Sequence, residues 1–456
     1  MGEGATGRRW RWCGALLLAA VLAGCADGGG GGDAKGTSTA ESEVPRPAAP
    51  GPTVGAPTGA PCDSTLALPD GFCATVFADT VGGARHVTVA ANGDVFVQLM
   101  TGKKSAESGS GRTGGVLALR DTDRDGAADT SALFGELGGT GIALHNGYLY
   151  ADGKSRVVRW RLPQGTLVPE GAAEAIVTGL PLGGHEARNI ALDTAGNLYV
   201  NVGSLTNSCQ RKDRGDRSPG RDRCTELRTR AGIWKFSASK PRQTQSTGQR
   251  FATGIRNAIG LTVSPLDGKV YATQHGRDQL AQNWGFSALA SAENPAEELL
   301  QVNAGDDFGW PYCYFHVGQQ KLVLAPEYGG DSTRVGRCAE KKAPLATYPG
   351  HWAPMSLLFY TGTQFPERYR GGAFIAFHGS WNRAPEPQEG YRVVFQPMAD
   401  GQPTGAYETF ADGFAGGVKQ PGTARHRPVG LAQGPDGALY ITDDKGGRIW
   451  KVSYRR

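Results

Sequence analysis

Short apolar runs that follow a glycine recur along the chain, and most of them contain an aromatic residue. The glycine often comes after Asp or Asn, which is typical of a tight turn that leads into a strand. "NGDVFVQ" and "DGALYIT" are two examples. The pattern therefore predicts a turn and a strand at each position. The six runs begin at residues 92, 146, 195, 267, 371 and 436.

A second run follows each first run, and its apolar and polar residues alternate, as in "GRIWKVSY". Alternation predicts strands with one solvated face, so we assign these runs to the outer part of each unit. Six paired units of about 66 residues, without helical segments between them, favour a six-bladed β-propeller of the all-β class. A pair of β-sandwiches with repeated turns is the alternative. The second runs lie at 114–121, 155–162, 231–238, 297–304, 390–397 and 447–454.

Composition agrees with a turn-rich β protein, because 69 of the 456 residues are glycine and 39% are hydrophobic. The strand-like segment 71–79 precedes the first unit, and we expect it to complete the last blade and close the ring. The net charge is +5, from 48 basic and 43 acidic residues. No Lys/Arg block contains interleaved aromatic residues, so nucleic acid is not expected as a partner.

The N-terminus has the features of a targeting segment. The basic stretch "RRWR" precedes the apolar run "GALLLAAVLAG", and a cysteine follows. The sequence Leu22-Ala23-Gly24-Cys25 resembles the bacterial lipobox. That resemblance implies a signal peptide over 1–24 and lipidation of Cys25. An ordinary signal peptide with a chance cysteine is the alternative.

The next segment predicts a tether. Residues 25–61 contain the anchor cysteine and a stretch rich in Gly, Pro, Ala, Ser and Thr, which cannot bury enough apolar surface to fold. The propeller domain is expected over 62–456. Ala26, in place of Asp after the lipidated cysteine, favours the outer over the inner membrane. We therefore expect the protein at the periplasmic face of the bacterial envelope, attached through its lipid anchor only.

Six cysteines lie beyond the signal and the anchor, and an exported chain with an even number favours disulfides. They fall as neighbours in sequence, which suggests neighbour pairing among the fifteen possible connectivities. The chain has no C-x-x-C pair, so zinc and covalently attached haem are not expected. The predicted pairs are Cys62 with Cys73, Cys209 with Cys224, and Cys313 with Cys338.

Candidate catalytic and ligand-binding side chains lie near strand edges, which a propeller brings together around its axis. His185 follows two glycines that leave space ahead of the imidazole, and a neutral imidazole can accept a proton near neutral pH. Arg256 and Asn257 precede a strand in the same way. A guanidinium at an inward strand edge needs an anion or solvent. A hydrogen-bonded structural role is the alternative for His185.

Arg425 and Arg427 flank a histidine and, on a strand, would point to the same side. Two like charges repel unless an anion lies between them, so the pair predicts an anionic ligand. A surface pair bonded to loop carbonyls is the alternative. With His378 and Arg383 of "AFHGSWNR", these residues predict a pocket for a multiply anionic ligand beside a proton acceptor.

The chain resembles the soluble quinoprotein sugar dehydrogenases, especially the sorbosone dehydrogenase branch, over most of residues 66–456. The resemblance rests on the order of "GGHEARNIALDTAGNLYVNVGS", "GIRNAIGLTVSPLDGKVYATQHGRD", "GDDFGWPYCY", "AFHGSWNR" and "RHRPVGLAQGPDGALYITDD". It implies a six-bladed propeller that binds pyrroloquinoline quinone (PQQ) and calcium. It also implies oxidation of an aldose or a sugar aldehyde, with electrons passed to a separate acceptor, a quinone or a cytochrome.

The resemblance also implies residue roles. His185 matches the base that takes the hydroxyl proton while hydride passes to C5 of PQQ. Arg256 matches the arginine over the quinone oxygen, where it would stabilise the developing negative charge, and Asn257 is its neighbour in the site. Arg425 and Arg427 match the pair that binds the PQQ carboxylates.

The backbone carbonyls of Gly276 and Arg277 match the loop that ligates the active-site calcium. The family's glutamine and lysine contacts to PQQ have no clear match, and His378 or Arg383 can stand in for the lysine. Gly184 takes the place of an acidic residue before the base, so the resemblance does not fix which sugar is oxidised.

Some features leave other hypotheses open. "DTDRDGAAD" over 121–129 fits the start of an EF-hand, but Ala132 occupies position twelve, so a solvated hairpin turn is favoured over a calcium site. The basic loop 205–230 is interpreted as solvated, and docking of an acidic redox partner there is a second hypothesis. A cofactor-free binding or scaffold propeller is the main alternative function. A metal-dependent propeller lactonase is less favoured.

Overall fold

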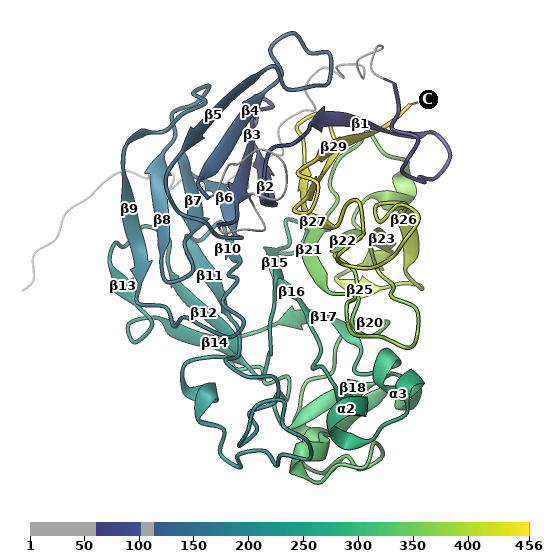
Figure 1. The fold of residues 1–456 in the computed structure, drawn as a ribbon. Helices are drawn as coiled ribbons and strands as arrows, with labels where there is room; N and C mark the ends of the chain where they lie inside the picture. The colour runs from purple at the N-terminus through teal and green to yellow at the C-terminus, as the bar shows by residue number, and fades with distance from the viewer. Residues whose placement is uncertain (1–60, 102–113, 456) are drawn as a thin grey trace, which may run out of the picture. The chain divides into compact units, whose positions relative to one another are not determined.

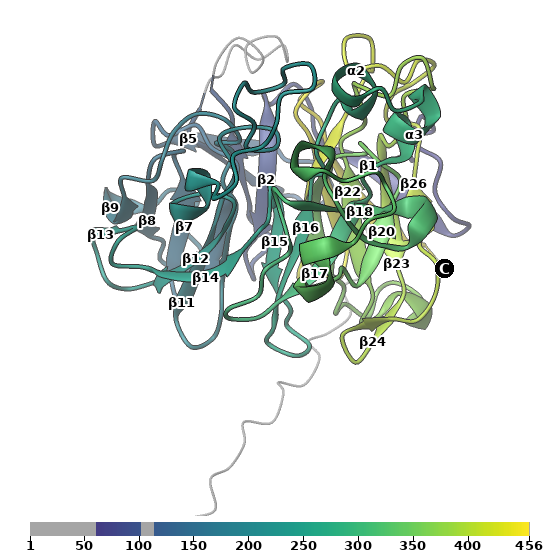
Figure 2. The ribbon, with the colours of Figure 1, turned by 90° about the horizontal axis from the view of Figure 1, so that it is seen from below.

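The computed structural model describes residues 61–101 and 114–455, and strands dominate them. Six sheets of antiparallel strands stand around a common axis, as Figures 1 and 2 show from two directions. We call these sheets blades and number them in chain order. The signal peptide, the lipidated Cys25 and the tether lie outside the described residues, so they stay predictions.

The strands of each blade follow one another from the inside outward. Blade 1 contains β2 (Ala84–Val89), β3 (Val95–Leu99), β4 (Val116–Arg120) and β5 (Thr130–Phe134). Blade 2 contains β6 (Ile142–His145), β7 (Tyr148–Asp152), β8 (Val157–Arg161), β9 (Glu170–Thr178) and the parallel β13 (Gln243–Thr244). Blade 3 contains β10 (Ile190–Leu192), β11 (Asn197–Val202), β12 (Gly232–Ser237) and β14 (Gln249–Thr253).

The other three blades have the same order. Blade 4 contains β15 (Gly260–Val263), β16 (Val270–Gln274), β17 (Glu297–Val302) and β20 (Ala346–Tyr348). Blade 5 contains β21 (Pro354–Phe359), β22 (Ala373–Phe377), β23 (Arg392–Gln396) and β26 (Glu408–Ala411). Blade 6 contains β27 (Pro428–Gln433), β28 (Leu439–Asp443), β29 (Ile449–Tyr454) and β1 (Phe72–Ala78).

Smaller elements lie in the connections between these strands. The short strand pairs are β18 (Cys313–His316) with β19 (Lys321–Leu324), and β24 (Met398–Ala399) with β25 (Gln402–Pro403). The α-helices are α2 (Leu280–Trp284) and α3 (Ala288–Glu293). The 3-10 helices are η1 (Thr225–Arg228), η2 (Val317–Gln319), η3 (Pro326–Tyr328), η4 (Gly336–Glu340) and η5 (Glu367–Tyr369).

The blades close into a ring. Each of the innermost strands β2, β6, β10, β15, β21 and β27 contacts the next, and β27 returns to β2. The predicted all-β, six-bladed β-propeller is therefore confirmed. The closing strand is also confirmed, because β1 pairs with β29 from Phe72 opposite Tyr454 to Ala78 opposite Ile449. The first apolar runs of the sequence form the second strand of each blade.

Two predictions about elements are wrong. The alternating second runs form the third strands, not the outermost ones, and β17 and β23 are buried at all but one position. Neighbouring blades cover both of their faces, so alternation in sequence does not report a solvated face here. The expectation of no helical segments fails in the connection between β16 and β17, which contains α2 and α3.

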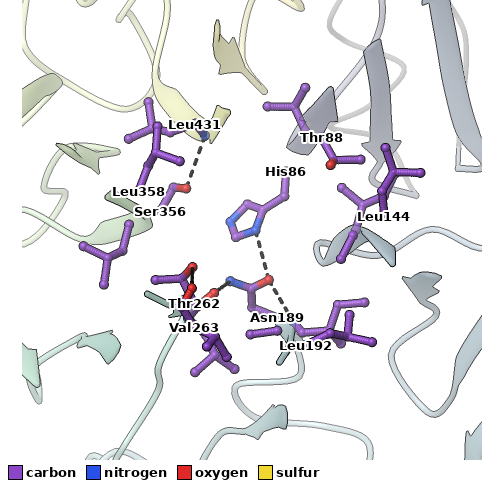
Figure 3. A pocket seen from close by; sticks show the side chains of 17 residues that line it. His86, Thr88, Leu144, Asn189, Leu192, Thr262, Val263, Ser356, Leu358 and Leu431 are labelled. Carbon is purple, nitrogen blue, oxygen red and sulfur yellow. Dashed lines mark hydrogen bonds between the residues drawn. The ribbon is translucent and has the colours of Figure 1, made fainter. Parts of the chain in front are cut away.

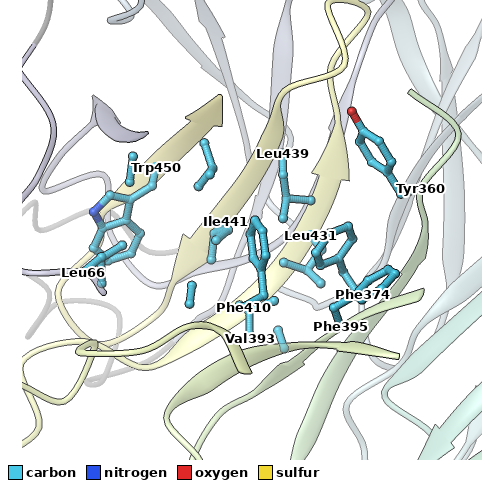
Figure 4. Close-up of a cluster of buried hydrophobic side chains, with 14 of the residues drawn as sticks. Leu66, Tyr360, Phe374, Val393, Phe395, Phe410, Leu431, Leu439, Ile441 and Trp450 are labelled. Carbon is cyan, nitrogen blue, oxygen red and sulfur yellow. The ribbon is translucent and has the colours of Figure 1, made fainter. Parts of the chain in front are cut away.

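Aromatic side chains join the last two blades to the N-terminal segment. Figure 4 shows Phe374, Phe395 and Phe410 of blade 5 packed near Ile441 of blade 6. Leu66, which precedes β1, belongs to the same cluster. A contiguous apolar core of this kind stabilises a fold through the area that it removes from water. It therefore fixes the closing strand against both blades.

All three predicted disulfides are confirmed. The Cα–Cα distances are 5.3, 6.0 and 5.8 Å for the pairs of Cys62 with Cys73, Cys209 with Cys224, and Cys313 with Cys338. Within residues 61–101 and 114–455, no helix combines the length and hydropathy that a membrane-spanning helix requires.

Candidate active site

The predicted site residues lie in loops at one end of the blades, which we call the site face. In an antiparallel blade the inner strand begins where the second strand ends, so both connections meet at the same end. The site face therefore consists of the loops before the inner strands and the loops after the second strands. Helices α2 and α3 belong to this end and appear at the top of Figure 2.

His185 lies in the loop before β10, and one nitrogen of its imidazole is held in place. Nδ1 lies 3.0 Å from both the carbonyl oxygen and the hydroxyl oxygen of Ser204. The carbonyl can only accept, and the hydroxyl donates its own hydrogen to the Thr206 carbonyl oxygen at 2.7 Å, so Nδ1 carries the proton. Nε2 makes no hydrogen bond to a described residue, and its lone pair is left to accept a proton.

The charge state of His185 suits this role. Burial of the imidazole, together with the nearby guanidinium of Arg256, lowers the pKa of His185 to about 3. The ring is therefore neutral at neutral pH, which is the protonation state that a general base requires.

Two buried arginines hold the loop that carries His185. Arg188 is fully buried and Arg230 nearly so; both donate to backbone carbonyl oxygens of this loop, and Arg188 also binds the loop between β7 and β8. A planar guanidinium that binds several carbonyls fixes their relative positions. The acceptors are Lys154, Pro181 and His185 for Arg188, and Leu182 and Gly183 for Arg230.

The two glycines before His185 have a backbone conformation that other residues rarely adopt. Gly183 and Gly184 have φ angles of +83° and +62°, a region that side chains rarely adopt. A Cβ atom on Gly184 would lie 2.6 Å from the carbonyl oxygen of Ser204. The backbone of Ser204 and Leu205 thus fills the space beside Gly184. That the two glycines leave room for substrate ahead of the imidazole stays a prediction.

Arg256 precedes β15 and is 4% exposed. Its guanidinium donates to the two oxygens of Asn207 at 3.2 and 3.1 Å. It also donates to the Gly276 carbonyl oxygen at 2.8 Å and to Oδ2 of Asp278 at 3.0 Å. These bonds use four of the five N–H groups of Arg256. The remaining N–H is on Nη1, the nitrogen that binds Gly276, and it is left for a ligand.

Asp278 and Asn207 are central to the site, and sequence reasoning assigned no role to either. Oδ2 of Asp278 accepts from Arg214 at 2.7 Å as well as from Arg256, and Oδ1 accepts from Asn382 at 2.8 Å. Burial opposes ionisation of Asp278, but the surrounding cationic groups outweigh it and hold its pKa well below the usual value. The sequence contained a signal for Asp278, because in "HGRD" it directly follows Gly276 and Arg277, whose carbonyls were already candidates for the calcium site.

Asn257 and His275 complete this half of the site face. Oδ1 of Asn257 is buried and has no hydrogen-bond partner among the described residues. A buried acceptor of this kind is uncommon in folded proteins and is satisfied by a donor from water or a ligand. His275 donates from Nε2 to the Pro354 carbonyl at 2.8 Å, and burial lowers its pKa to about 4.

The predicted calcium loop has few free oxygens. The Gly276 carbonyl already accepts from Arg256, and its amide donates to Glu297 at 3.1 Å. The Arg277 side chain is buried in an ion pair with Glu327 at 2.5 Å. The carboxylate of Asp278 is fully engaged as described above. Calcium takes about six to eight oxygen ligands, and this loop supplies two carbonyls, one of them beside a guanidinium.

Arg425 and Arg427 do not share a strand face, because β27 begins only at Pro428. Arg425 is exposed and makes no ion pair with a described residue. Arg427 folds back and donates to the carbonyl oxygens of His378 at 3.0 Å and Gly379 at 2.7 Å. The prediction of two arginines on one strand is therefore wrong. Both guanidiniums nevertheless lie on the site face without a carboxylate within ion-pair distance in the described ranges.

His378 and Arg383 follow β22 and have different surroundings. Nε2 of His378 lies 2.7 Å from Oδ1 of Asp444, and Arg85 binds the other oxygen of Asp444 at 2.7 Å. Asp444 and Arg85 were not identified from the sequence. The sequence could have pointed to Asp444 through its position, because it directly follows the second strand of blade 6, as His378 follows the second strand of blade 5.

Arg383 is held by protein groups. It donates to the carbonyl oxygens of Ala292 at 2.6 Å, Gly350 at 3.0 Å and Pro387 at 3.0 Å, and to Glu293 at 2.6 Å. Four of its five N–H groups are thus occupied by loops of the site face. One N–H of Arg383 is left, and the contact of Arg383 with a cofactor stays a prediction.

The propeller axis contains an open-ended cavity of about 220 Å³, lined by the inner strands. Figure 3 shows His86 in it, with Nδ1 3.1 Å from Oδ1 of Asn189. None of the sequence-predicted site residues lines this cavity. A separate apolar cluster of Ile259, Met355 and Val429 comes from positions at or just before inner strands, next to the site-face loops.

The acidic hairpin between β4 and β5 lies at the opposite end of blade 1. Ligand atoms of Asp121, Asp123 and Asp129 lie within 4.8 Å of one another. Asp121 accepts from the Gly126 amide at 3.0 Å, and Asp129 from the Thr122 amide at 2.8 Å. These bonds shape the turn itself, in agreement with the hairpin interpretation. Calcium binding there stays a prediction.

Comparison with known proteins places this chain in a family. A model described as TrAA12-like matches residues 66–455. A PQQ-dependent sugar dehydrogenase of Hypocrea jecorina is 23% identical over 338 residues, which cover 68% of this chain and 73% of that protein. A PQQ-dependent pyranose dehydrogenase of Coprinopsis cinerea is 27% identical over 244 residues, 45% of this chain and 31% of that protein. The chain spans less than half the length of the first curated relatives that it matches.

Solved structures agree on the fold. The holo PQQ domain of the Coprinopsis cinerea pyranose dehydrogenase superposes with a TM-score of 0.69 at 20% identity, over 87% of this chain and 99% of that chain. The calcium structure of the Trichoderma reesei family AA12 protein gives 0.69 at 19% identity, over 87% and 98%. The resemblance to PQQ-dependent sugar dehydrogenases is confirmed at family level, whereas the sorbosone branch stays a prediction. The chain belongs to the TrAA12-like family.

Proposed function

We propose that the protein is a PQQ-dependent oxidoreductase that oxidises an aldose or a sugar aldehyde and passes electrons to a separate acceptor, a quinone or a cytochrome. One observation carries the proposal. A neutral imidazole with a free Nε2, on His185, lies on the site face near enough to the permanently charged guanidinium of Arg256 for the two to interact electrostatically. The PQQ dependence named for family relatives supports the choice of cofactor.

The residues present fit PQQ, a planar and multiply anionic group. Ile259, Met355 and Val429 are buried in one apolar cluster, which would support the loops around a bound ring system. Arg425 and Arg427 are cationic groups without carboxylate partners in the described chain, and they would hold carboxylates of the cofactor. The orphaned Oδ1 of Asn257 would accept a hydrogen bond from the cofactor or the substrate. When bound, PQQ supplies the hydride acceptor.

His185 would act as the general base. Its Nε2 lone pair would take the hydroxyl proton of the substrate, while Ser204 keeps the proton on Nδ1 in place. Arg256 would hold negative charge near the reacting atoms with its remaining N–H, because a guanidinium keeps its charge at any physiological pH. Asn207 and Asp278 fix the plane of that guanidinium.

Calcium at the carbonyls of Gly276 and Arg277 is a separate proposal. An AA12 structure that contains calcium supports it, but this chain supplies too few free oxygens for a complete site. The cofactor and water would have to provide most of the ligands. We therefore derive no chemical step from the ion.

A sugar substrate is supported by an exposed indole near the site. Trp381 is 57% exposed and makes no hydrogen bond or ring contact with a described residue. Its neighbours are fixed, since Ser380 donates to the Glu389 carbonyl at 2.8 Å and Asn382 reaches Asp278. An exposed aromatic face on a loop whose neighbouring residues are fixed suits the apolar face of a pyranose ring. We also propose that Cys25 carries a lipid anchor and that the protein lies in the periplasm.

Reconstitution tests the proposed function. PQQ is added to metal-stripped protein with and without calcium, its binding is measured, and dye reduction is followed across aldoses and sugar aldehydes. We expect turnover that requires PQQ and collapses in His185→Ala, with PQQ still bound by the variant. Absence of PQQ binding under both conditions would overturn the proposal.

A further inference from the structure

Of the two Ser204 oxygens beside Nδ1 of His185, the hydroxyl is the one that could change the position of the imidazole proton. Nδ1 faces two oxygens of Ser204, and the hydroxyl oxygen is able to donate as well as accept. If that hydroxyl turned to donate to Nδ1, the imidazole would carry its proton on Nε2 and lose its function as a base. The Ser204 hydroxyl hydrogen is instead committed to the Thr206 carbonyl oxygen at 2.7 Å.

One carboxylate fixes the position of that carbonyl. Glu226 accepts from the amides of Leu205 at 2.8 Å and Thr206 at 3.1 Å. Its other oxygen accepts from the Thr206 hydroxyl at 2.5 Å. Three hydrogen bonds to a charged acceptor hold the turn after Ser204 in one conformation, because such bonds are stronger than neutral ones.

The segment that carries Glu226 is itself tied down on both sides. Glu226 lies in η1, which begins directly after Cys224, and the disulfide of Cys224 with Cys209 closes the same loop. The Thr206 hydroxyl also accepts from the Cys209 amide at 2.9 Å. Beyond η1, Arg230 donates to the carbonyl oxygens of the loop that carries His185. The loop 203–231 therefore contacts the base from both sides.

We propose that Glu226 is a positioning residue that sets the tautomer of His185. It acts through the turn at Leu205 and Thr206, which directs the Ser204 hydroxyl away from Nδ1 and so leaves the lone pair on Nε2. The effect of Glu226 on catalysis rests on the proposed role of His185 as the base.

The direct test is the tautomer of His185 in protein without cofactor. ¹⁵N chemical shifts of labelled histidine distinguish a protonated Nδ1 from a protonated Nε2, and His185→Ala assigns the signal. We expect Nδ1–H in the native protein and in Thr206→Ser, which keeps the hydroxyl. In Thr206→Val and Glu226→Ala we expect a mixture of tautomers, and Glu226→Gln should restore the native signal because its amide oxygen still accepts from the turn. A native Nδ1–H signal in correctly folded Glu226→Ala and Thr206→Val would overturn the proposal.

Kinetics of the PQQ-loaded protein provide the second readout. Glu226→Ala and Thr206→Val should lower kcat by about tenfold or more while KM and PQQ affinity change little, since a misplaced proton removes the base and not a binding group. If His185→Ala is fully active, the proposed function fails. If His185→Ala is inactive and the Thr206 and Glu226 variants match the native protein, only the positioning role fails.

Discussion

At the residue scale, side chains of one type serve different purposes on the site face, and their hydrogen-bond partners distinguish them. Arg383 uses four of its N–H groups on protein acceptors, one of them Glu293, whereas Arg427 uses two, both on carbonyl oxygens, and has no carboxylate within ion-pair distance among the described residues. The sequence identified His185, Arg256 and Asn257 as candidates. It could not separate structural from ligand-binding arginines, because that difference depends on carbonyls brought from distant loops.

The low pKa of His185 predicts the acid side of the rate profile. With a folded-state pKa of about 3, the imidazole stays neutral as the pH falls from about 7 to about 5. We expect kcat/KM of the loaded protein to stay flat over that range, measured by initial rates in overlapping buffers. An acid limb centred near pH 6.5, the ordinary value for histidine, would contradict the account of a buried neutral base.

The two arginines Arg427 and Arg383 form a matched pair. Arg427→Leu should raise the Kd for PQQ by about tenfold or more, because a hydrogen bond to a charged group is worth about 1.5–3 kcal/mol. Arg383→Leu should leave that Kd nearly unchanged and lower the melting temperature, since its partners are protein carbonyls and Glu293. Fluorescence titration with PQQ and thermal melts measure both. Equal changes in Kd would show that the distinction is wrong.

Trp381 tests whether the substrate is a sugar ring. Trp381→Ala should raise KM for pyranose sugars several-fold with kcat nearly constant, because stacking binds the ground state and the transition state alike. Leu289→Ala is the control, since Leu289 is exposed to almost the same degree, 58% against 57%. A KM unchanged in Trp381→Ala, or raised equally by both substitutions, would speak against a sugar-binding indole.

At the element scale, turn chemistry and β periodicity located the strands correctly but not their depth in the blade. The glycine-led runs became second strands, and segment 71–79 became the closing β1. The third strands were predicted too far out in the blade, because alternation was taken to mean a solvated face, whereas neighbouring blades bury both faces of these strands. Arg425 and Arg427 were placed on a strand that begins only at Pro428. The outermost strands β5, β14 and β20 carry no distinct pattern, since they pair on one edge only.

The β16–β17 pair contains a buried carboxylic acid with a predictable pH signature. Glu298 accepts from Gln274 of the facing strand at 2.6 Å, and burial raises its pKa from 4.5 to about 7. A raised folded-state pKa gives stability that is complete below about pH 4.5 and is lost as the pH rises through about 7, at up to about 1.4 kcal/mol per pH unit.

Glu298→Gln should remove this dependence, because glutamine keeps the acceptor and does not ionise. The stability of the variant relative to the native protein should therefore increase between about pH 5 and about pH 7. Urea denaturation at the two pH values measures the change. A difference that is independent of pH would mean that Glu298 is ionised in the folded protein at neutral pH.

At the scale of the whole molecule, the ring brings together residues from four blades that the sequence separates by up to about 240 positions. His185, Arg256, His378 and Arg427 meet on one face only because the inner strands close into a circle. The order of motifs predicted that ring and its candidate cofactor. The roles of Asn207, Asp278 and Asp444 were not predicted, because each residue forms its hydrogen bonds with loops of different blades.

The central claim is that His185 acts as a base toward a sugar beside bound PQQ. The most direct measurement is single-turnover reduction of bound PQQ by a reactive sugar, followed by absorbance in a stopped-flow instrument, for the native protein and His185→Ala. The account predicts that both bind PQQ and that the variant reduces it at least about a hundredfold more slowly, as expected for loss of a general base. Equal reduction rates in the two proteins, or no binding of PQQ by the native protein, would contradict it.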